Sequence, residues 1–348
     1  MAIAATGAVS FADLRSEFVG GSSAISFSDL YRGGTNIRSK AADNLGVNLA
    51  ANVPTSGAID FSSFRSQAKG FKYTFTAGAT DQTASALFGS DYSVNYPKEI
   101  VIDSGVELGA TSTTEEALEI NSGGAGTITV TNNGTLSGAG GAAGADGGDA
   151  FEAAVACIFV NNGTVRAGGG GGGIGGDGSY QSTTSDTRCE LYCQKSVRAG
   201  GGKMVYHWQS TSYCNGYLAF VDCNVTTITS GGATYTKGSP CGTGIDPCNI
   251  GGTIRDYNRI TRSVTSTINT TGGTGGIGTG YNQSSGTGVA GGTNAGTGGN
   301  GGGYGASGST GTNGTSTNGA AGGAAGKYLR GLSFITFTNN GTALGGTA

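Results

Sequence analysis

Glycine recurs at every third residue over long parts of this 348-residue chain, and that spacing limits the folds available to it. The longest series begins at Gly296 and ends at Gly314, and it resumes in the same phase at Gly323 and Gly326. Shorter series cover 138–147, 169–178 and 272–278. The period matches a polyproline II helix, which has three residues per turn and no internal hydrogen bonds. We therefore predict a bundle of polyglycine II helices whose backbone groups pair laterally.

Two other structures compete with this prediction. A collagen triple helix has the same period, but imino acids preorganise it and the glycine tracts contain no proline. A flexible linker needs no period, and seven successive glycines in register from Gly296 to Gly314 argue against one. The 71 glycines bury no side chains, so dense backbone hydrogen bonding has to hold these tracts.

Strands are predicted where apolar residues alternate, at 71–76, 100–102 and 128–131. One phrase, a strand followed by Asn-Asn-Gly-Thr and a second strand, occurs at 129–136, 159–165 and 337–344. Asn-Gly is a strong turn signal because both residues tolerate positive φ. The repeat predicts either stacked coils or meander hairpins. Because its third copy lies far from the other two, we expect the chain to leave this β layer and return to it at the end.

The first seventy residues contain three related phrases, at 8–15, 24–31 and 58–65. Each places Ser or Asp before a short apolar pattern at helical spacing, which predicts a short capped helix. Units this small bury little surface alone, so they dock against each other or against another protein. We interpret 1–70 as an attachment segment, and a helical cap for the following domain is the alternative.

An insert at 179–271 differs from the rest of the chain because it holds the single histidine, the single tryptophan and many tyrosines. Tyrosine and tryptophan supply contact area at a small entropic cost, so binding surfaces favour them. The residues predicted to bind a receptor are Tyr192, Tyr206, His207, Trp208, Tyr213 and Tyr217. The competing interpretation is that these aromatic side chains form the insert's own small core.

Six of the seven cysteines also lie in the insert: Cys189, Cys193, Cys214, Cys223, Cys241 and Cys248. Their even number in a loop-rich segment predicts up to three disulfides, with the connectivity left open. Their spacing does not match the paired C-x2-C of zinc ribbons, so no metal site is predicted. The seventh, Cys157, lies in an apolar run and is predicted to be a buried thiol.

Several functions lack support in the sequence. The net charge is −3 without any basic run, which argues against nucleic acid, and no apolar stretch is long enough for a membrane-spanning helix. Acids considered for glycoside hydrolysis are Asp177, Asp186, Glu190, Asp222, Asp256, Glu115 and Glu116. They form no recognisable motif, so we predict no catalytic residue and no cofactor. The region 1–9 lacks the pattern of a secretory signal, which favours release by lysis or within a particle.

The Ser-Phe-x-Asp-Leu phrases at 10–14 and 26–30 resemble those that open many tailed-phage fibre proteins. The glycine tracts with a variable insert resemble the distal tail-fibre adhesins of T-even-like phages. In that family a bundle of polyglycine II helices presents loops at its tip, and the loops choose the bacterial receptor. The resemblance implies that 179–271 and 281–285 are tip loops, although one large cysteine-rich insert replaces the family's several short loops.

We therefore predict a mostly β and irregular virion protein, located in the tail or fibre and extracellular after lysis. The predicted domains are the attachment segment 1–70, a β-strand domain at 71–137 joined by strands near 153–166 and 333–344, a glycine bundle at 138–178 and 272–332, and the recognition insert 179–271. The expected partners are a host surface receptor, either a glycan or an outer-membrane protein, and other virion proteins, which would bind through 1–70. Whether the chain also forms a homo-oligomer is left open.

The predicted function is that of a non-enzymatic adhesin. The alternatives are a purely structural fibre or coat subunit, a polysaccharide-degrading tail protein, and an ice-binding protein that uses the same glycine helices and abundant threonine.

Overall fold

The computed structural model describes residues 3–20, 24–193, 203–207, 217–222, 227–230, 233–245 and 254–348, and it describes side chains outside 186–263. The chain divides into two compact units. One comprises Met1–Gly178 and Thr270–Ala348, and the other is Ser179–Asn269. No helix within the described ranges is long and apolar enough to cross a membrane.

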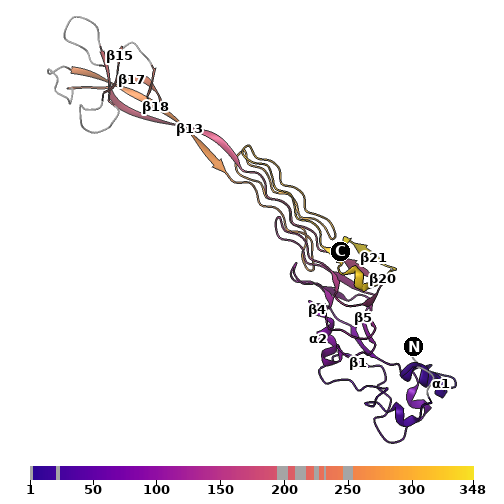
Figure 1. Cartoon of the computed structure of the whole chain (residues 1–348). Coiled ribbons are helices and arrows are strands. Elements are labelled where there is room, and N and C mark those ends of the chain that lie inside the picture. The colour runs from indigo at the N-terminus through magenta and orange to yellow at the C-terminus, as the bar shows by residue number, and fades with distance from the viewer. Residues whose placement is uncertain are drawn as a thin grey trace. The chain divides into compact units, whose positions relative to one another are not determined.

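The first unit is built on stacked coils of chain, each giving one strand to each of three sheets (Figure 1). The first sheet holds β1 (Val47–Asn48), β2 (Phe71–Phe75), β5 (Lys98–Ile102), β8 (Ile128–Asn132), β11 (Cys157–Asn161) and β20 (Ile335–Asn339). The second holds β3 (Ala79–Thr80), β6 (Glu107–Gly109), β9 (Thr135–Ser137), β12 (Thr164–Arg166) and β21 (Thr342–Leu344). The third holds β4 (Gln82–Thr83), β7 (Leu118–Ile120) and β10 (Phe151–Ala153). Backbone hydrogen bonds extend the third sheet from β10 to β19 (Lys327–Leu329), which pairs with β22 (Gly346–Thr347).

The strands of consecutive coils pair in parallel, whereas β1, which precedes the coils, runs antiparallel to β2. Stacked coils, a parallel β-helix, are therefore the correct alternative, and meander hairpins are wrong. The three Asn-Gly turns also differ from expectation, since Gly134, Gly163 and Gly341 are not among the residues with positive φ. Glycine is required there by close stacking, because a Cβ atom on Gly163 would lie 2.1 Å from the Gly134 carbonyl oxygen of the preceding coil.

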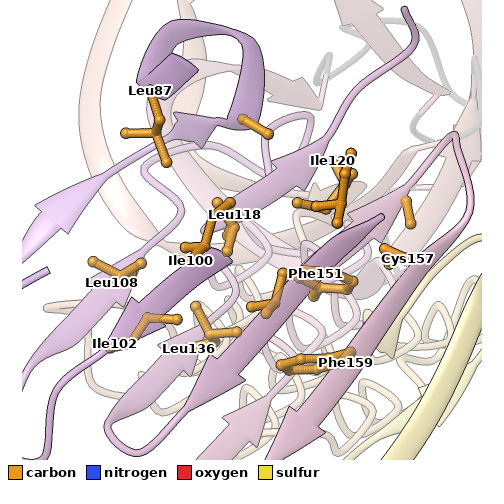
Figure 2. Packing of buried hydrophobic residues seen from close by; sticks show 14 of the residues in the cluster. Leu87, Ile100, Ile102, Leu108, Leu118, Ile120, Leu136, Phe151, Cys157 and Phe159 are labelled. Atoms are coloured by element: carbon orange, nitrogen blue, oxygen red, sulfur yellow. The ribbon is translucent and has the colours of Figure 1, made fainter. Parts of the chain in front are cut away.

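The core of the β-helix consists of the inward-facing residues of these strands, which stack from coil to coil (Figure 2). The rings of Phe151 and Phe159 lie 4.4 Å apart, nearly parallel. Cys157 packs in the same cluster and is 4% exposed, which confirms the predicted buried thiol. Burial raises the pKa of Cys157 to about 12, so the thiol stays protonated and unreactive.

Short helices make up much of the N-terminal part, namely α1 (Phe11–Leu14), η1 (Arg15–Val19), η2 (Phe27–Leu30) and η3 (Phe61–Phe64), and the β-helix carries α2 (Ala84–Phe88), η4 (Gly89–Asp91) and η5 (Leu332–Phe334). The predicted caps are confirmed: Ser10 and Ser26 each form a capping box with an Asp three residues later, and Asp60 caps η3. Leu14, Leu30 and Phe64 are fully buried and form a small core of their own.

The fully buried Asp91 joins this N-terminal part to the β-helix. Its carboxylate accepts hydrogen bonds from Arg38 Nε at 2.8 Å, from the Ala41 backbone at 2.7 Å and from Asn44 Nδ2 at 3.1 Å. Buried charge is costly unless it is paired and hydrogen-bonded, and each of these donors offsets that cost.

The glycine tracts leave the β-helix between its second and third sheets. One excursion, 138–149, connects β9 to β10, and a second, much longer one separates β12 from β19. In Figure 1 the resulting extended segments run side by side, and segments far apart in sequence are neighbours. Their backbone N–H groups donate to carbonyls of adjacent tracts, so the bundle is held by main-chain hydrogen bonds.

The second unit is a β structure of its own. One sheet has the order β13 (Gly178–Cys193), β18 (Ile254–Thr270), β17 (Ala233–Ile245) and β16 (Thr227–Ser230), and β14 (Lys203–His207) pairs with β15 (Tyr217–Asp222). Side-chain hydrogen bonds link Gln181 to Thr267 at 3.0 Å and Thr183 to Thr265 at 2.9 Å.

Candidate functional site

The central tract of the glycine bundle, 168–176, is buried apart from Ile174. Along this tract, backbone N–H groups that are three residues apart donate to the same neighbouring tract. Gly172 and Gly175 donate to Gly276 and Gly273, whereas Gly173 and Gly176 donate to Ser309 and Thr312, all at 2.7–2.9 Å. Its carbonyls accept from two further tracts, with Gly299 donating to Gly173 and Gly323 to Gly171. The tract is therefore enclosed by its neighbours, and backbone takes the place that side chains have in an ordinary core.

Close packing explains why glycine is needed in this tract. A Cβ atom on Gly172 would lie 1.9 Å from the Gly299 carbonyl oxygen, and one on Gly173 would lie 1.9 Å from that of Ala320. In contrast, Gly303 has nothing within 4 Å of its Cβ position. The bundle thus tolerates side chains on its outside only, where they can vary without disturbing the packing.

One end of the bundle gathers two turns and both connections to the second unit. The turn at 292–295 meets Thr270, whose Oγ1 donates to the Thr293 carbonyl at 2.7 Å. The turn at 314–317 meets Asp177, whose backbone N–H donates to Thr317 Oγ1 at 2.7 Å. The two turns also contact each other, because Thr315 N donates to the Asn294 carbonyl at 3.0 Å. We call this set of residues, 177, 270, 292–295 and 314–317, the distal end.

The distal end is polar and exposed. Thr293, Asn294 and Thr317 are all exposed, and so is the side chain of Asp177, whose Oδ1 accepts from Gly272 N at 3.0 Å. Asn294 has a φ of 60°, a left-handed conformation that asparagine tolerates better than most residues. Hydroxyl and amide side chains held on hydrogen-bonded turns suit a polar ligand.

One predicted tip loop, 281–285, lies at the other end of the bundle, next to the β-helix. A Cβ atom on Gly109 of β6 would lie 1.9 Å from the Tyr281 ring, and Tyr281 N donates to the Gly138 carbonyl at 3.1 Å. The turn at 280–285 therefore packs against the β-helix, and its assignment as a tip loop is wrong. Tyr281 is needed there to cover a glycine of the second sheet.

The predicted receptor-binding residues belong to the second unit. Tyr192 lies in β13, Tyr206 and His207 lie in β14, and Tyr217 lies in β15, where His207 and Tyr217 are partners in the strand register. Trp208 and Tyr213 lie outside the described residues. The side chains of all six aromatic residues, and of the six insert cysteines, also lie outside the described part, so their roles and the disulfides stay predictions.

A second surface, which the sequence analysis did not single out, lies on the N-terminal part. Phe11, Phe27 and Phe61 follow the three helix caps, and their ring centroids lie 4.9, 5.1 and 5.1 Å apart in the three possible pairs. Phe11 is 39% exposed and the other two rings are half-buried. Three repeats thus supply one ring each to a cluster, the aromatic platform. The signal was the recurrence of Phe directly after each cap.

A parallel β-helix and a glycine bundle filled by backbone together form an extended scaffold, which carries polar turns at one end of the bundle and an aromatic platform on the N-terminal part. The chain belongs to the phage tail fibre adhesin Gp38 family, whose model matches residues 67–348. It is accordingly a component of the virion tail fibre and an adhesin.

Comparison with solved structures adds one similar protein. The gp37–gp38 adhesin tip complex of the bacteriophage S16 long tail fibre matches with 18% identity and a TM-score of 0.38, over 84% of this chain and 88% of that chain. No curated protein matches this chain significantly.

Proposed function

We propose that this adhesin is non-enzymatic and binds a host-cell receptor, a surface glycan or an outer-membrane protein, through the distal end and the insert. The observation that carries the proposal is that Asp177 and Thr270, where the chain enters and leaves the insert, are hydrogen-bonded to the two distal turns. Polar turns and the base of an aromatic-rich insert therefore share one end of the bundle. The aromatic residues of the insert supply the contact area that polar turns lack.

We further assign the bundle to polyglycine II packing. Support comes from the three-residue alternation of hydrogen-bond partners along the central tract, since a helix with three residues per turn presents each third residue to the same neighbour. Such packing holds the distal turns without a side-chain core. The insert then needs another source of stability, which the six cysteines supply as disulfides in this assignment.

Deletion of the insert tests the site. A variant in which a short glycine bridge replaces 179–269 keeps Asp177 and Thr270, and it is compared with the full chain for adsorption to host cells. The expected result is loss of adsorption with an unchanged melting temperature of the first unit. Unchanged adsorption would mean that the receptor site lies outside the insert. If a Thr293→Lys/Thr317→Lys variant of the distal turns also adsorbs normally, a structural fibre subunit becomes the better description.

The aromatic platform supports an attachment role for the first seventy residues. Phe11, Phe27 and Phe61 come from three similar phrases and surround one point, an approximately three-fold arrangement within a single chain. An exposed cluster of aromatic rings is typical of a surface that contacts another protein. We therefore assign the platform to contact with another protein of the tail fibre.

Removal of one ring tests this attachment. Phe11→Ser removes the most exposed of the three rings, so it disturbs the N-terminal core less than a change at Phe27 or Phe61 would. It is expected to abolish co-purification with the other tail fibre proteins. Ser28→Ala, a change at an exposed neighbouring position, is the control. Retention of the fibre by the Phe11→Ser variant would assign attachment to another surface, and would leave the receptor proposal untouched because the host-cell assay uses the isolated chain.

A further inference from the structure

The excursion 138–149 accompanies the central tract of the glycine bundle over only part of its length. Its first limb donates from Gly144 N to the Gly172 carbonyl at 2.8 Å, and its second limb accepts from Gly171 N at the Ala145 carbonyl, also at 2.8 Å. The chain turns between these two limbs, so neither of them continues past this level. The other neighbours of the central tract do continue to the distal end, and they are the tracts at 272–279, 296–302, 306–312 and 317–326.

Past this level the central tract has unpaired backbone groups on the side where the excursion ends. The three-residue period sets the Ile174 N–H in the direction of the Gly171 N–H, and the Gly175 carbonyl in the direction of the Gly172 carbonyl. Neither group forms a hydrogen bond within the described part of the chain, although Gly175 is buried. Buried backbone groups are almost always paired, so this side of the tract is suited to a ligand. Ile174 is 50% exposed, whereas the rest of the tract is buried.

The tracts on either side leave backbone groups unpaired at the same level. Gly278 N donates to the excursion, and the equivalent donor three residues earlier, Gly275 N, has no partner among the residues that the structure describes. On the other side the Ala324 carbonyl accepts from the excursion. Three residues earlier, Ala321 neither donates nor accepts through its backbone in the described ranges. Three tracts therefore turn unpaired groups toward one place.

We call these backbone groups of Ile174, Gly175, Gly275 and Ala321, together with the side chain of Asp177, the open face. The carboxylate limits this face at the distal end, where its Oδ1 accepts a backbone hydrogen bond at 3.0 Å. At about 3.1 Å per residue, the path from the last bonded level to Asp177 is about 15 Å long. The three tracts that form the face contain no lysine or arginine over 168–177, 271–279 and 317–326.

We infer that the open face binds a neutral saccharide of the host surface. Sugar hydroxyls both donate and accept, so they match the three N–H groups and two carbonyls that the face offers. The apolar face of a sugar ring covers the exposed side chain of Ile174. A neutral sugar is favoured over an anionic one because the face carries a carboxylate and no cation. The inference rests on the proposed receptor binding and gives its surface glycan a position on the side of the bundle.

An extended protein loop is the competing ligand, since it also carries donors and acceptors. Close packing limits the loops that would fit. Where the excursion itself lies in this position, a Cβ atom on Gly140 would lie 2.2 Å from the Gly278 carbonyl oxygen, and one on Gly147 would lie 2.2 Å from that of Gly168. A loop would need glycine at each such position, whereas a saccharide meets no such sequence requirement.

Saturation-transfer NMR tests the inference with oligosaccharides released from the envelope of a strain on which the phage grows. We expect transfer from the full chain to the neutral fraction and not to the acidic fraction. Ile174→Glu places a charged side chain in the open face and is expected to weaken binding about tenfold. Ile277→Glu is the matched control, because Ile277 is 44% exposed on an adjacent tract, and this variant is expected to bind like the unmodified chain.

A second pair of variants tests a single donor. Ala321→Pro removes an N–H group that has no partner in the described structure, and proline suits a helix of the polyproline II type. It is expected to weaken binding about fivefold, as for the loss of one hydrogen bond. Thr310→Pro removes an N–H group that is likewise unpaired among the described residues, at an exposed position of another tract, and should leave binding unchanged.

Absence of transfer from the full chain to the neutral fraction overturns the inference. Equal binding by Ala321→Pro and Thr310→Pro also overturns it, and this comparison stands even if Ile174→Glu does not fold. Retention of a purified outer-membrane protein that is lost in Ala321→Pro, without any transfer to oligosaccharides, would assign the open face to a protein loop. The variant without 179–269 keeps the open face and should still show transfer, whereas normal adsorption of that variant to host cells contradicts the proposed function instead.

Discussion

The side-chain amide of Asn132 donates to Asn161 Oδ1 at 2.8 Å, and both residues are fully buried. Asn161 in turn donates to Asn339 at 2.7 Å and to the Thr342 carbonyl at 3.1 Å, so one amide satisfies groups on two coils. A parallel ladder running alongside lies at the surface, where Asn162 donates to Asn133 at 2.9 Å and accepts from Asn340 at 2.9 Å. These two ladders hold the three Asn-Gly turns in register.

Replacing Asn161 by Ala should destabilise the β-helix strongly. The change leaves one N–H of the buried Asn132 amide without an acceptor, while the same amide keeps its bond to the Thr164 carbonyl at 2.9 Å. An unsatisfied buried polar group costs about 1–3 kcal/mol. We expect a decrease of that order in the free energy of unfolding, measured by denaturant titration with circular dichroism. Asn162→Ala removes the equivalent residue of the surface ladder and should cost clearly less, because water can replace its partners. Equal losses would mean that burial of the inner ladder does not matter.

A methyl group inside the glycine bundle should be more damaging than one on its surface. Gly172→Ala places a Cβ atom 1.9 Å from a backbone oxygen, and no flexible side chain is present to give way. Overpacking of this kind costs about 1–3 kcal/mol or more. Gly303→Ala meets nothing within 4 Å and should be neutral or slightly stabilising, since it reduces the entropy of the unfolded chain. Melting temperatures of the two variants check this contrast, which fails if both melt alike.

The sequence predicted the parts of the fold that follow from periodicity and local caps. Alternation located β2, β5 and β8, and Ser or Asp before an apolar pattern located α1, η2 and η3. Contacts between distant segments were harder to predict. Gly134 has the sequence of a hairpin turn, yet stacking against the Val106 carbonyl, 2.2 Å from a Cβ atom placed there, explains its glycine. The sequence predicts Tyr281 at the tip of the bundle, whereas its contact with β6 places it at the base.

The candidate site was only partly predictable for a related reason. The insert stands out by its composition, but the distal turns look like ordinary glycine-tract sequence until tertiary hydrogen bonds bring 292–295 and 314–317 together. The aromatic platform was hidden because Phe11, Phe27 and Phe61 occupy apolar positions that a helical pattern assigns to a core. Their equivalence in three phrases was visible, whereas their meeting at one point depends on how the three helices pack.

Acid should release the N-terminal part from the β-helix. Burial alone would raise the pKa of Asp91, but hydrogen bonds from Ala41, Arg38 and Asn44 outweigh burial and hold that pKa below its ordinary value. A depressed carboxyl pKa stabilises the fold above the unfolded-state pKa of about 3.9, and the contribution is lost as the pH falls through the folded value. We therefore expect limited proteolysis near residue 70 to accelerate below about pH 4. Asp91→Ala should show this cleavage already at neutral pH, and resistance of that variant would argue that the link does not depend on Asp91.

Alkaline conditions should weaken the third sheet through Glu116. Burial, and after it the hydrogen bond and the charge of Glu152, together raise the pKa of Glu116 to about 7, while Arg330 is a cation beside both, 3.9 Å from Glu116 and 3.7 Å from Glu152. A carboxyl group whose folded pKa is raised binds its proton more tightly in the folded state. Stability is therefore fully present below the unfolded value of about 4.3 and decreases as the pH rises toward and through 7.

The variant that removes this titration is Glu116→Gln, which keeps the shape of the protonated group. Its melting temperature should exceed that of the unmodified protein at pH 8 and approach it at pH 5, because a neutral amide does not repel Glu152 at either pH. Glu115→Gln, at the exposed neighbouring position, removes the same formal charge and should keep the larger part of the pH dependence, because the charge of Glu115 acts on Glu119 only after burial and Glu152. If Glu116→Gln shows the same pH profile of melting temperature as the unmodified chain, the proton responsible lies on another group of the cluster. Glu119 is then the next residue to replace, because burial and the charge of Glu152 raise the pKa of Glu119 as well.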